Sequence, residues 1–146
     1  MTKRITLNYD GYWRENNFLS VPKTSGVYTF FECSYNADKK TITLLRTLYI
    51  GQAEDCYTRI TSHDKIPALK KSLTPGNQLC VHIAEVLAVD KDRTENALVF
   101  YHKPPFNDKL KDEFSYDETT ISCSGRYGLL TQNFTVQKKP LAFVRW

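Results

Sequence analysis

Two neighbouring segments rich in β-branched and aromatic residues constrain the fold of this chain most strongly. Residues 27–33 and 41–50 each have the composition of a strand, and residues 34–40 between them have turn chemistry. Together they predict an antiparallel hairpin. Since side chains alternate along a strand, Tyr49 is expected on one face of the second strand and the more apolar residues on the other. The apolar set is Ile42, Leu44, Leu48 and Ile50.

The rest of the chain predicts helices and a further strand around this hairpin. Gly51-Gln52 is expected to end the second strand. Asp92 and Glu95 resemble the N-cap and the third helical residue of a capping box. The predicted fold is α/β (α+β), with a small, mainly antiparallel three-stranded central sheet flanked by helices. The further expected elements are helices over 54–63, 68–73 and from about 92 to Pro104-Pro105, a third strand over 79–89, and edge strands over 121–124 and 141–146.

Length and composition fit a single domain that needs no covalent cross-links. The chain has 146 residues, of which 41% are hydrophobic and 25% charged, as in ordinary globular proteins. No apolar run reaches the ~20 residues of a membrane helix, and no apolar segment follows Lys3-Arg4, so neither membrane association nor a secretory signal is expected. The four cysteines are far apart and contain no C-x-x-C pair, which argues against a zinc site. We therefore expect reduced, mostly buried thiols in a cytoplasmic protein.

The distribution of charge hints at a polyanionic partner. The chain has 20 basic and 16 acidic residues and a net charge of +4. Lys65, Lys70 and Lys71 are clustered and are candidate nucleic-acid contacts, and Lys138, Lys139 and Arg145 form a second group near the end. On charge alone a mixed, solvated surface is the favoured explanation, and the clusters indicate a partner only if they border a chemical site.

A set of small motifs occurs in a fixed order along the predicted elements. The set comprises Gly26-Val27-Tyr28, Leu48-Tyr49-Ile50-Gly51, Arg59, His63, Glu95 and Asn107. In this order the residues resemble the GIY-YIG nuclease superfamily, and the histidine four positions after the arginine resembles its type II restriction endonuclease branch. The resemblance covers about residues 25–107, and the first triplet departs from the family pattern in having valine for isoleucine.

The resemblance implies a fold, an activity and a set of site residues. It implies one GIY-YIG-like nuclease domain over residues 1–146, with its core at about 25–107, a lead-in at 1–24 and a C-terminal extension at 108–146. The implied activity is hydrolysis of DNA phosphodiester bonds with one Mg²⁺ or Mn²⁺ ion per site, leaving a 5′-phosphate and a 3′-hydroxyl. Glu95 is the implied metal ligand and Tyr28 the implied general base.

The remaining motif residues have chemistry that suits the same reaction. Arg59 offers a permanently charged fork for a phosphate oxygen, and His63 is expected to accept or relay the proton of Tyr28. Tyr49 is expected to orient the water or a phosphate oxygen, and Asn107 to fix the geometry through hydrogen bonds. A free phenol has a pKa of ~10, so Tyr28 needs cationic neighbours to act as a base at neutral pH.

Each motif residue also has an ordinary structural explanation. Strand tyrosines usually pack, a lone arginine or histidine is usually a solvated helix residue, Glu95 suits a capping box, and an asparagine after two prolines suits a turn. The functional interpretation therefore rests on the joint pattern. Its main alternative is a catalytically silent DNA-binding or accessory module on the same fold, and a weaker one is a protein-interaction domain. Cutting both DNA strands would favour a homodimer.

Overall fold

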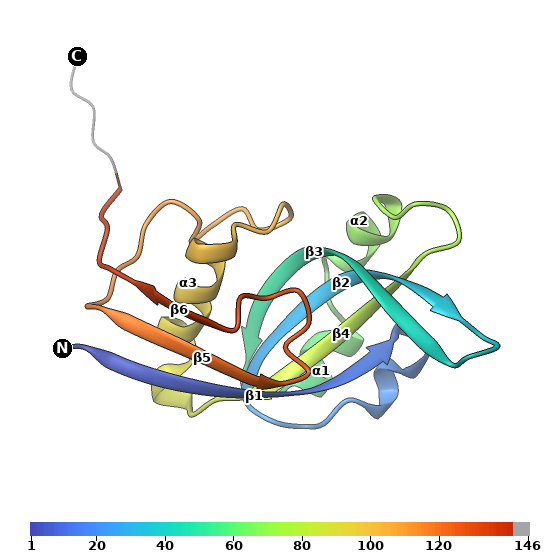
Figure 1. Cartoon of the computed structure of the whole chain (residues 1–146), viewed down its shortest axis with the longest axis horizontal. Coiled ribbons are helices and arrows are strands. Elements are labelled where there is room, and N and C mark those ends of the chain that lie inside the picture. The colour runs from blue at the N-terminus through green and yellow to red at the C-terminus, as the bar shows by residue number, and fades with distance from the viewer. Residues whose placement is uncertain (142–146) are drawn as a thin grey trace, which may run out of the picture.

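The computed structural model of the chain describes residues 1–141, which form one curled sheet with helices packed against it (Figure 1). The sheet has six strands in the order β3-β2-β4-β1-β5-β6. Neighbouring strands are antiparallel except β1 and β5, which are parallel. The strands are β1 (Lys3–Arg14), β2 (Gly26–Asn36), β3 (Thr41–Ala53), β4 (Gln78–Glu85), β5 (Thr119–Gly125) and β6 (Asn133–Val136). The helices are α1 (Cys56–Thr61), α2 (Ile66–Lys71) and α3 (Lys91–His102), with short 3-10 turns η1 (Glu15–Ser20) and η2 (Ala88–Asp90).

The six-stranded mixed sheet shows that the predicted three-stranded sheet is wrong. The three predicted strands are present as β2, β3 and β4, and the predicted edge strand over 121–124 lies within β5. The expected lead-in instead supplies β1, which lies inside the sheet between β4 and β5. Buried Ile5, Leu7 and Tyr9 alternate with exposed residues in β1, which is the period-two pattern of a half-buried strand. The three-stranded prediction leaves this pattern out.

Several predicted boundaries also differ from the structure. The strand β3 continues through Gly51-Gln52 to Ala53 because both residues stay paired with β2. The N-cap residue of α3 is Asp90, so Asp92 lies in the first turn and the predicted capping box is wrong. The Asp92 carboxylate instead accepts a hydrogen bond from the Gln52 side chain. The remaining shifts are the end of α1 at Thr61, α2 over Ile66–Lys71, and the end of β4 at Glu85.

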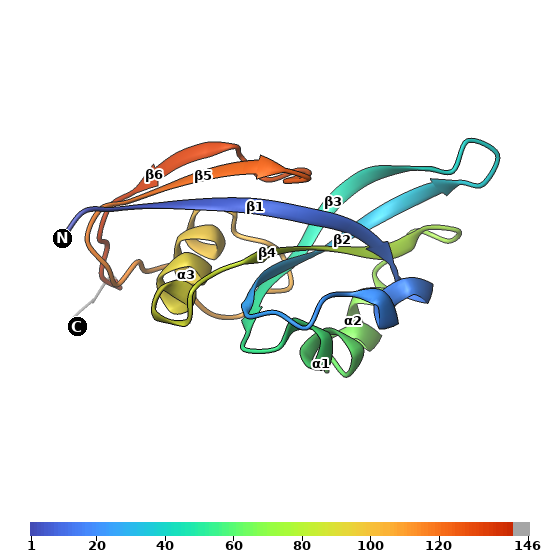
Figure 2. The same ribbon diagram turned by 90° about the horizontal axis from the view of Figure 1, so that it is seen from below.

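Two apolar clusters cover opposite faces of the central strands. Val27 and Phe31 of β2 belong to the cluster that contains α3 residues Leu98 and Val99, whereas the Tyr28 and Phe30 side chains belong to the cluster under α1 and α2. In Figure 2 the helix α3 lies apart from the pair α1 and α2. Because both faces are covered, β2 carries a nearly continuous buried run rather than an alternating one.

A bulge in β3 changes which side chains share a face. Phe30 pairs with Tyr49 and Phe31 pairs with Thr47, so Leu48 is an extra residue on β3. Leu48 consequently packs in the same cluster as Tyr49, and Ile50 packs in the other. The predicted common face for Leu48 and Ile50 is therefore wrong, because strict alternation holds only where the ladder has no inserted residue.

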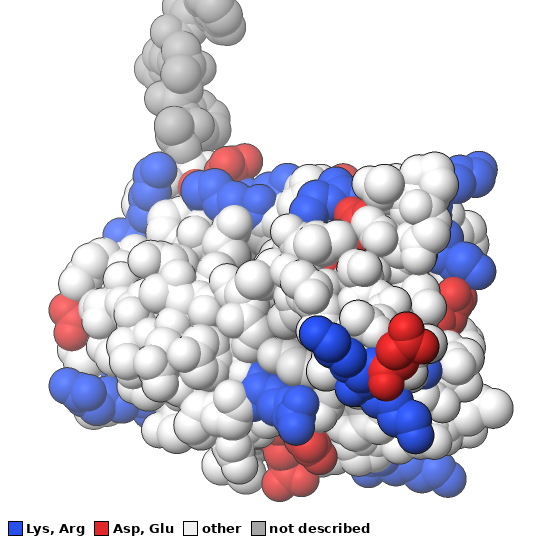
Figure 3. All heavy atoms as spheres, turned by 45° about the vertical axis from the view of Figure 1, so that its right-hand side comes forward, with Lys and Arg blue, Asp and Glu red and all other residues white. Residues whose placement is uncertain are grey.

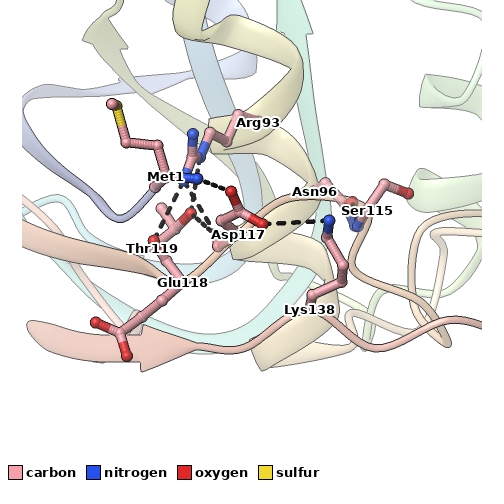
Figure 4. Close-up of polar contacts among 8 residues, drawn as sticks. All are labelled: Met1, Arg93, Asn96, Ser115, Asp117, Glu118, Thr119 and Lys138. Carbon is pink, nitrogen blue, oxygen red and sulfur yellow. Dashed lines mark hydrogen bonds and ion pairs between the residues drawn. The ribbon is translucent and has the colours of Figure 1, made fainter.

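Polar side chains of α3 form hydrogen bonds to residues 113–119 of the C-terminal extension (Figure 4). Arg93 donates to the hydroxyl of Thr119 at 2.8 Å and to the main-chain oxygens of Met1, Asp117 and Glu118. Asn96 joins the same face of α3 to the loop before β5, with its amide nitrogen 2.9 Å from the Glu113 carbonyl oxygen. These contacts satisfy main-chain oxygens that would otherwise lack partners. They account for Arg93 and Asn96 without a catalytic role.

Two further expectations concern the cysteines and membrane association. All four cysteines are free and buried, as predicted. Within residues 1–141, every helix is too short or too polar to cross a membrane. The predicted edge strand over 141–146 and the basic residue Arg145 lie almost wholly outside the described residues, which end at Leu141.

Candidate active site

The two tyrosine-containing triplets face each other across the β2–β3 hairpin. Tyr28 pairs with Gly51, and Phe30, two residues further along β2, pairs with Tyr49. The rings of Tyr28 and Tyr49 are 6.4 Å apart between centroids, and both lie in the cluster under α1 and α2. The hairpin register thus brings two phenols, distant in the sequence, to one edge of the sheet.

Close approach explains why both triplets contain glycine. A Cβ atom on Gly51 would lie 2.4 Å from the Tyr28 hydroxyl, and a Cβ atom on Gly26 would lie 2.1 Å from the carbonyl oxygen of Ala84. Neither distance is compatible with a side chain. Gly51 therefore provides the space into which the Tyr28 ring fits.

Replacing Gly51 with alanine is expected to displace the Tyr28 ring and to lower the free energy of unfolding by about 1–3 kcal/mol, the usual cost of overpacking a core. Urea unfolding measures the loss. Gly76→Ala is the control, because Gly76 has a φ of +92° but no atom within 4 Å of an added Cβ, so this variant reports backbone strain without a clash. A loss no larger for Gly51→Ala than for Gly76→Ala would contradict this role for Gly51.

A hydrogen bond joins Tyr28 to His63, which follows the end of α1. The Tyr28 hydroxyl oxygen is 2.7 Å from Nε2 of His63, and both groups are buried. The rings of His63 and Tyr49 are also in contact, with centroids 5.2 Å apart in an edge-to-face arrangement. His63 was expected within the helix of Arg59, but it lies two residues beyond Thr61, the last residue of α1. The side chain nevertheless reaches the same phenol.

The surroundings of His63 determine which ring nitrogen carries its proton. Burial and the nearby Arg59 guanidinium lower the pKa of His63 to about 4, so the ring is neutral at pH 7. The main-chain N–H of Lys65 donates to Nδ1 at 3.1 Å, which assigns the single ring proton to Nε2. His63 therefore donates to the Tyr28 oxygen in the resting protein, whereas the sequence-based expectation has it accept the phenol proton.

Arg59 lies on α1, which is capped by Asp55. The Asp55 carboxylate accepts a hydrogen bond from the main-chain N–H of Thr58, and this fixes the start of the helix. The Arg59 guanidinium is 3.0 Å from a carboxylate oxygen of Asp64 and also acts on Tyr28, whose pKa it lowers. A partly exposed guanidinium beside a buried phenol is suitably placed to contact a phosphate oxygen.

The two tyrosines are held as neutral phenols in the resting protein. Burial raises the pKa of Tyr28 well above its ordinary value of 10.0, the neighbouring Tyr49 raises it further, and Arg59 opposes both effects. Burial also raises the pKa of Tyr49, and Glu95 adds to the rise. Tyr28 therefore needs additional positive charge nearby before it can act as a base at neutral pH.

Glu95 projects from α3 toward the same edge of the sheet. Burial and the nearby Asp92 carboxylate raise the pKa of Glu95 from 4.5 to about 7, while Gln52, Arg59 and Lys91 oppose the rise. Because the capping box is not formed, Glu95 has no capping role in the helix. A half-buried carboxylate with a raised pKa beside a pocket is a recognised feature of functional sites.

Asn107 is bound on both sides by the main chain of Ile50. The Ile50 N–H donates to its side-chain oxygen at 3.0 Å, and its amide nitrogen donates to the Ile50 carbonyl at 2.8 Å. These two bonds connect the loop after α3 to β3, between Tyr49 and Gly51. Asn107 is therefore a positioning residue for the second triplet.

A pocket of about 330 Å³ lies between β3, α3 and the segment that precedes α2. Its lining includes Tyr49, Glu95 and Lys65, together with the 107–110 segment after α3. The sequence reasoning did not identify Gln52 or residues 108–110 as part of this region. The place of Gln52 directly after the second triplet is the one signal that could have suggested it.

The donor set of the pocket fits a hydrated divalent cation. Within residues 1–141, no group of three or more His, Cys, Asp and Glu side chains is arranged to hold a metal. Two carboxylates line the pocket, Glu95 and Asp108, and Asp108 is paired with Lys65 at 2.8 Å. Mg²⁺ commonly binds through one or two carboxylates while it keeps several waters. Glu95 is thus the residue that could hold such an ion.

The three candidate lysines differ in their positions. Lys65 lines the pocket and is 2.8 Å from Asp108. Lys70 is 3.2 Å from Glu15, and Lys71 is exposed on α2, so neither lines the pocket. Of the three predicted nucleic-acid contacts, the structure brings Lys65 to the candidate active site.

Comparisons with known proteins identify no relative. No family model, no curated protein and no solved structure matches the chain.

Proposed function

We propose that this chain is an endonuclease that hydrolyses DNA phosphodiester bonds with one Mg²⁺ or Mn²⁺ ion. The observation that carries the proposal is the convergence of Tyr28, Tyr49, Arg59, His63 and Glu95 from β2, β3, α1, the segment after it and α3. A phenol, a guanidinium and a carboxylate that perturb one another's pKa values form a cluster of the kind found at functional sites.

In the proposed reaction, a water molecule attacks phosphorus and the bond from phosphorus to the 3′ oxygen breaks. The products are a 5′-phosphate and a 3′-hydroxyl, and the 3′ oxygen takes its proton from solvent. Before the attack the Tyr28 phenol releases its proton to solvent, and the resulting phenolate accepts the proton of the attacking water. Arg59 binds a non-bridging phosphate oxygen and compensates the negative charge that grows in the transition state. Tyr49 orients the phosphate or the water.

Glu95 would hold the divalent cation, which supplies positive charge at the phosphate and favours the ionised forms of nearby groups. His63 has a supporting role. Its Nε2–H donates to the Tyr28 oxygen, a bond that grows stronger when that oxygen is negatively charged. His63 and Arg59 together therefore stabilise the phenolate that the reaction needs.

A catalytically silent DNA-binding module on the same fold is the second candidate. The observation that favours it is the raised pKa of Tyr28, which keeps the phenol protonated in the resting protein. The two candidates make different predictions for supercoiled plasmid. The nuclease converts it to nicked circles, whereas the module binds it and leaves it intact.

The test is a plasmid assay with chemical identification of the product ends. With Mg²⁺ or Mn²⁺ the protein is expected to nick supercoiled plasmid, and EDTA is expected to stop the reaction. DNA ligase should reseal the nicks, since ligation requires a 5′-phosphate and a 3′-hydroxyl. Binding without nicking in both metals would favour the silent module, and nicks that cannot be resealed would refute the proposed chemistry.

The setting and assembly follow from the same proposal. A cytoplasmic location is supported by the four free, buried thiols. Since one site cuts one strand at a time, efficient double-strand cleavage calls for a homodimer on DNA. Light scattering with and without a duplex measures the mass of the complex, and a monomer in both conditions would exclude the dimer.

A further inference from the structure

A second concave site lies on the opposite face of the sheet from Tyr28. This site, the hairpin pocket, lies beside the β2–β3 hairpin and has a volume of about 490 Å³. The pocket residues Tyr12 and Ile42 pack against the cluster that contains Leu98, whereas Tyr28 packs in the cluster under α1 and α2. The hairpin pocket is therefore separate from the candidate active site.

The hairpin pocket is positively charged and its charges are not neutralised locally. Its lining includes Arg14, Lys40 and Arg126 but no acidic side chain. Within residues 1–141, none of these three cations forms an ion pair with a carboxylate. Figure 3 brings forward the side of the molecule that carries the hairpin, and lysine and arginine predominate over acidic side chains on that face. Unneutralised cations around a hollow favour an anionic ligand.

The Arg14 guanidinium is held in place from two sides. Its carbon lies 3.7 Å from the centre of the Tyr35 ring, and one of its nitrogens donates to the side-chain oxygen of Gln78 at 3.3 Å. A guanidinium placed over a ring face keeps in-plane N–H groups available for a further acceptor. Arg14 is thus oriented before any ligand binds.

Arg126 is fixed through its main chain. Its N–H donates to the Tyr9 carbonyl oxygen at 2.9 Å, and its own carbonyl oxygen accepts a 2.7 Å hydrogen bond from Nδ1 of the fully buried His82. The Arg126 guanidinium carbon lies 5.9 Å from the centre of the Tyr12 ring. A core histidine and a neighbouring strand therefore set the place of the second guanidinium, and a fixed cation loses less conformational freedom when a ligand binds.

The charge and size of the hairpin pocket favour two linked phosphates over one. A phosphate monoester carries roughly −1.5 to −2 charges at neutral pH, which leaves part of three positive charges uncompensated. Guanidinium groups bind phosphate through paired N–H donors, and an ammonium adds a point charge. The volume of about 490 Å³ lies in the range of roughly 300–1,000 Å³ that organic ligands occupy, so there is space for more than the phosphates.

We propose that the hairpin pocket binds a small organic diphosphate, with its two linked phosphates on Arg14, Lys40 and Arg126. The neutral polar side chains of Asn17 and Thr41, which also line the pocket, offer hydrogen bonds to the organic part. The inference does not rest on the proposed function, because the pocket and Tyr28 lie on opposite faces of the sheet.

The experiment is calorimetric titration with probes that differ in one feature each. ADP carries two linked phosphates, AMP lacks the second phosphate, and citrate is a polyanion with carboxylates only. All solutions contain EDTA, so that no metal ion joins a phosphate to Glu95. A short single-stranded oligonucleotide, added to the ADP complex, tests whether the ligand is instead a nucleic-acid backbone.

Two triple variants of equal charge change accompany the wild type. The test variant is Arg14→Gln/Lys40→Gln/Arg126→Gln, and the control is Arg4→Gln/Lys138→Gln/Lys139→Gln, which alters exposed residues at the other end of the sheet. A double variant, Lys40→Gln/Arg126→Gln, leaves the Arg14–Gln78 hydrogen bond intact. Urea unfolding of each variant establishes that it is folded.

Wild type is expected to bind ADP about 10-fold more tightly than AMP or citrate. The affinity for ADP should fall roughly 100-fold in the test variant, roughly 10-fold in the double variant, and less than about 2-fold in the control. Three results would each overturn the inference. They are no binding of ADP to wild type at about 10 mM, equal losses in the folded double variant and the control, and displacement of ADP by the oligonucleotide at a lower phosphate concentration.

The result is distinguishable from that for the proposed function. If plasmid is nicked but ADP does not bind, the pocket inference is wrong and the nuclease proposal stands. If ADP binds as expected but no metal supports nicking, the diphosphate site stands and the nuclease proposal fails.

Discussion

Replacing Tyr28 with phenylalanine is expected to lower the rate of plasmid nicking roughly 1,000-fold, within the range for loss of a general base. The substitution removes the oxygen that would take the proton of the attacking water and leaves the ring in place between Gly51 and Phe30. It also leaves the Nε2–H of His63 without its partner, which costs stability on the order of 1–3 kcal/mol. Single-turnover nicking, with urea unfolding of the same samples, separates the two effects.

Tyr9→Phe is the matched control for Tyr28→Phe. The Tyr9 hydroxyl is also buried but has no hydrogen-bond partner among the described residues, and the ring stacks on His82. Removing an unpaired buried hydroxyl should leave stability unchanged or slightly higher, and the nicking rate should not change. A fully active Tyr28→Phe protein would exclude Tyr28 as the base, and equal losses in both variants would attribute the effect to the fold.

Replacing Glu95 with glutamine is expected to abolish metal-dependent nicking and, above neutral pH, to stabilise the metal-free fold. The pKa of Glu95 is raised to about 7 in the folded chain and is about 4.5 without the fold. The folded state therefore binds the proton more tightly than the unfolded state. The free energy of unfolding is therefore highest below about pH 4.5, where Glu95 is protonated in both states. It falls as the pH rises toward 7 and stays lower at higher pH.

Glutamine cannot ionise, so the free energy of unfolding of Glu95→Gln does not fall with pH through this residue. Its gain over wild type should be near zero at about pH 4.5 and roughly 1–3 kcal/mol at about pH 8. Urea unfolding in EDTA at both pH values measures the gain. Glu54→Gln, at an exposed position before α1, should gain nothing at either pH and should keep its nicking activity. A pH-independent difference for Glu95→Gln would show that the Glu95 carboxylate is not buried as described.

The same pKa predicts how activity depends on pH. Cation binding requires the ionised carboxylate, so nicking at limiting Mg²⁺ should rise as pH increases through about 7. His63, with a pKa of about 4, should contribute no inflection near 6.5. Functional residues commonly lower the stability of a fold, as the ionised Glu95 carboxylate is expected to do here.

The hairpin was predictable from the sequence because its signal is local. The β-branched and aromatic residues of 27–33 and 41–50 and the turn between them identify β2 and β3 directly. The strand β1 could also be predicted, from the alternation of Ile5, Leu7 and Tyr9 with polar residues. Finding it requires that every segment of the sequence be tested for a period of two. The position of β1 between β4 and β5 could not be predicted from the sequence, because strand order depends on long-range packing.

The sequence could name the motif residues of the candidate site but not their arrangement in space. The ordered motifs identify Tyr28, Tyr49 and Glu95 together, because each comes from an element that the sequence marks. The inserted residue Leu48, which places the Leu48 side chain on the same face as Tyr49, has no local signal. The proton position on His63 depends on the main-chain N–H of Lys65, and no residue pattern records a main-chain donor. Such features follow from tertiary geometry alone.

The central claim is that Arg59 and Glu95, from different helices, act on one phosphate, and a double-variant cycle on single-turnover nicking tests it most directly. Arg59→Lys and Glu95→Asp keep the charges and are expected to lower the rate by measurable factors. If both groups serve one site, the double variant should be at least about 10-fold faster than the product of the two single effects. Independent effects that multiply within about 2-fold, or a wild type that nicks no DNA in either metal, would contradict the account.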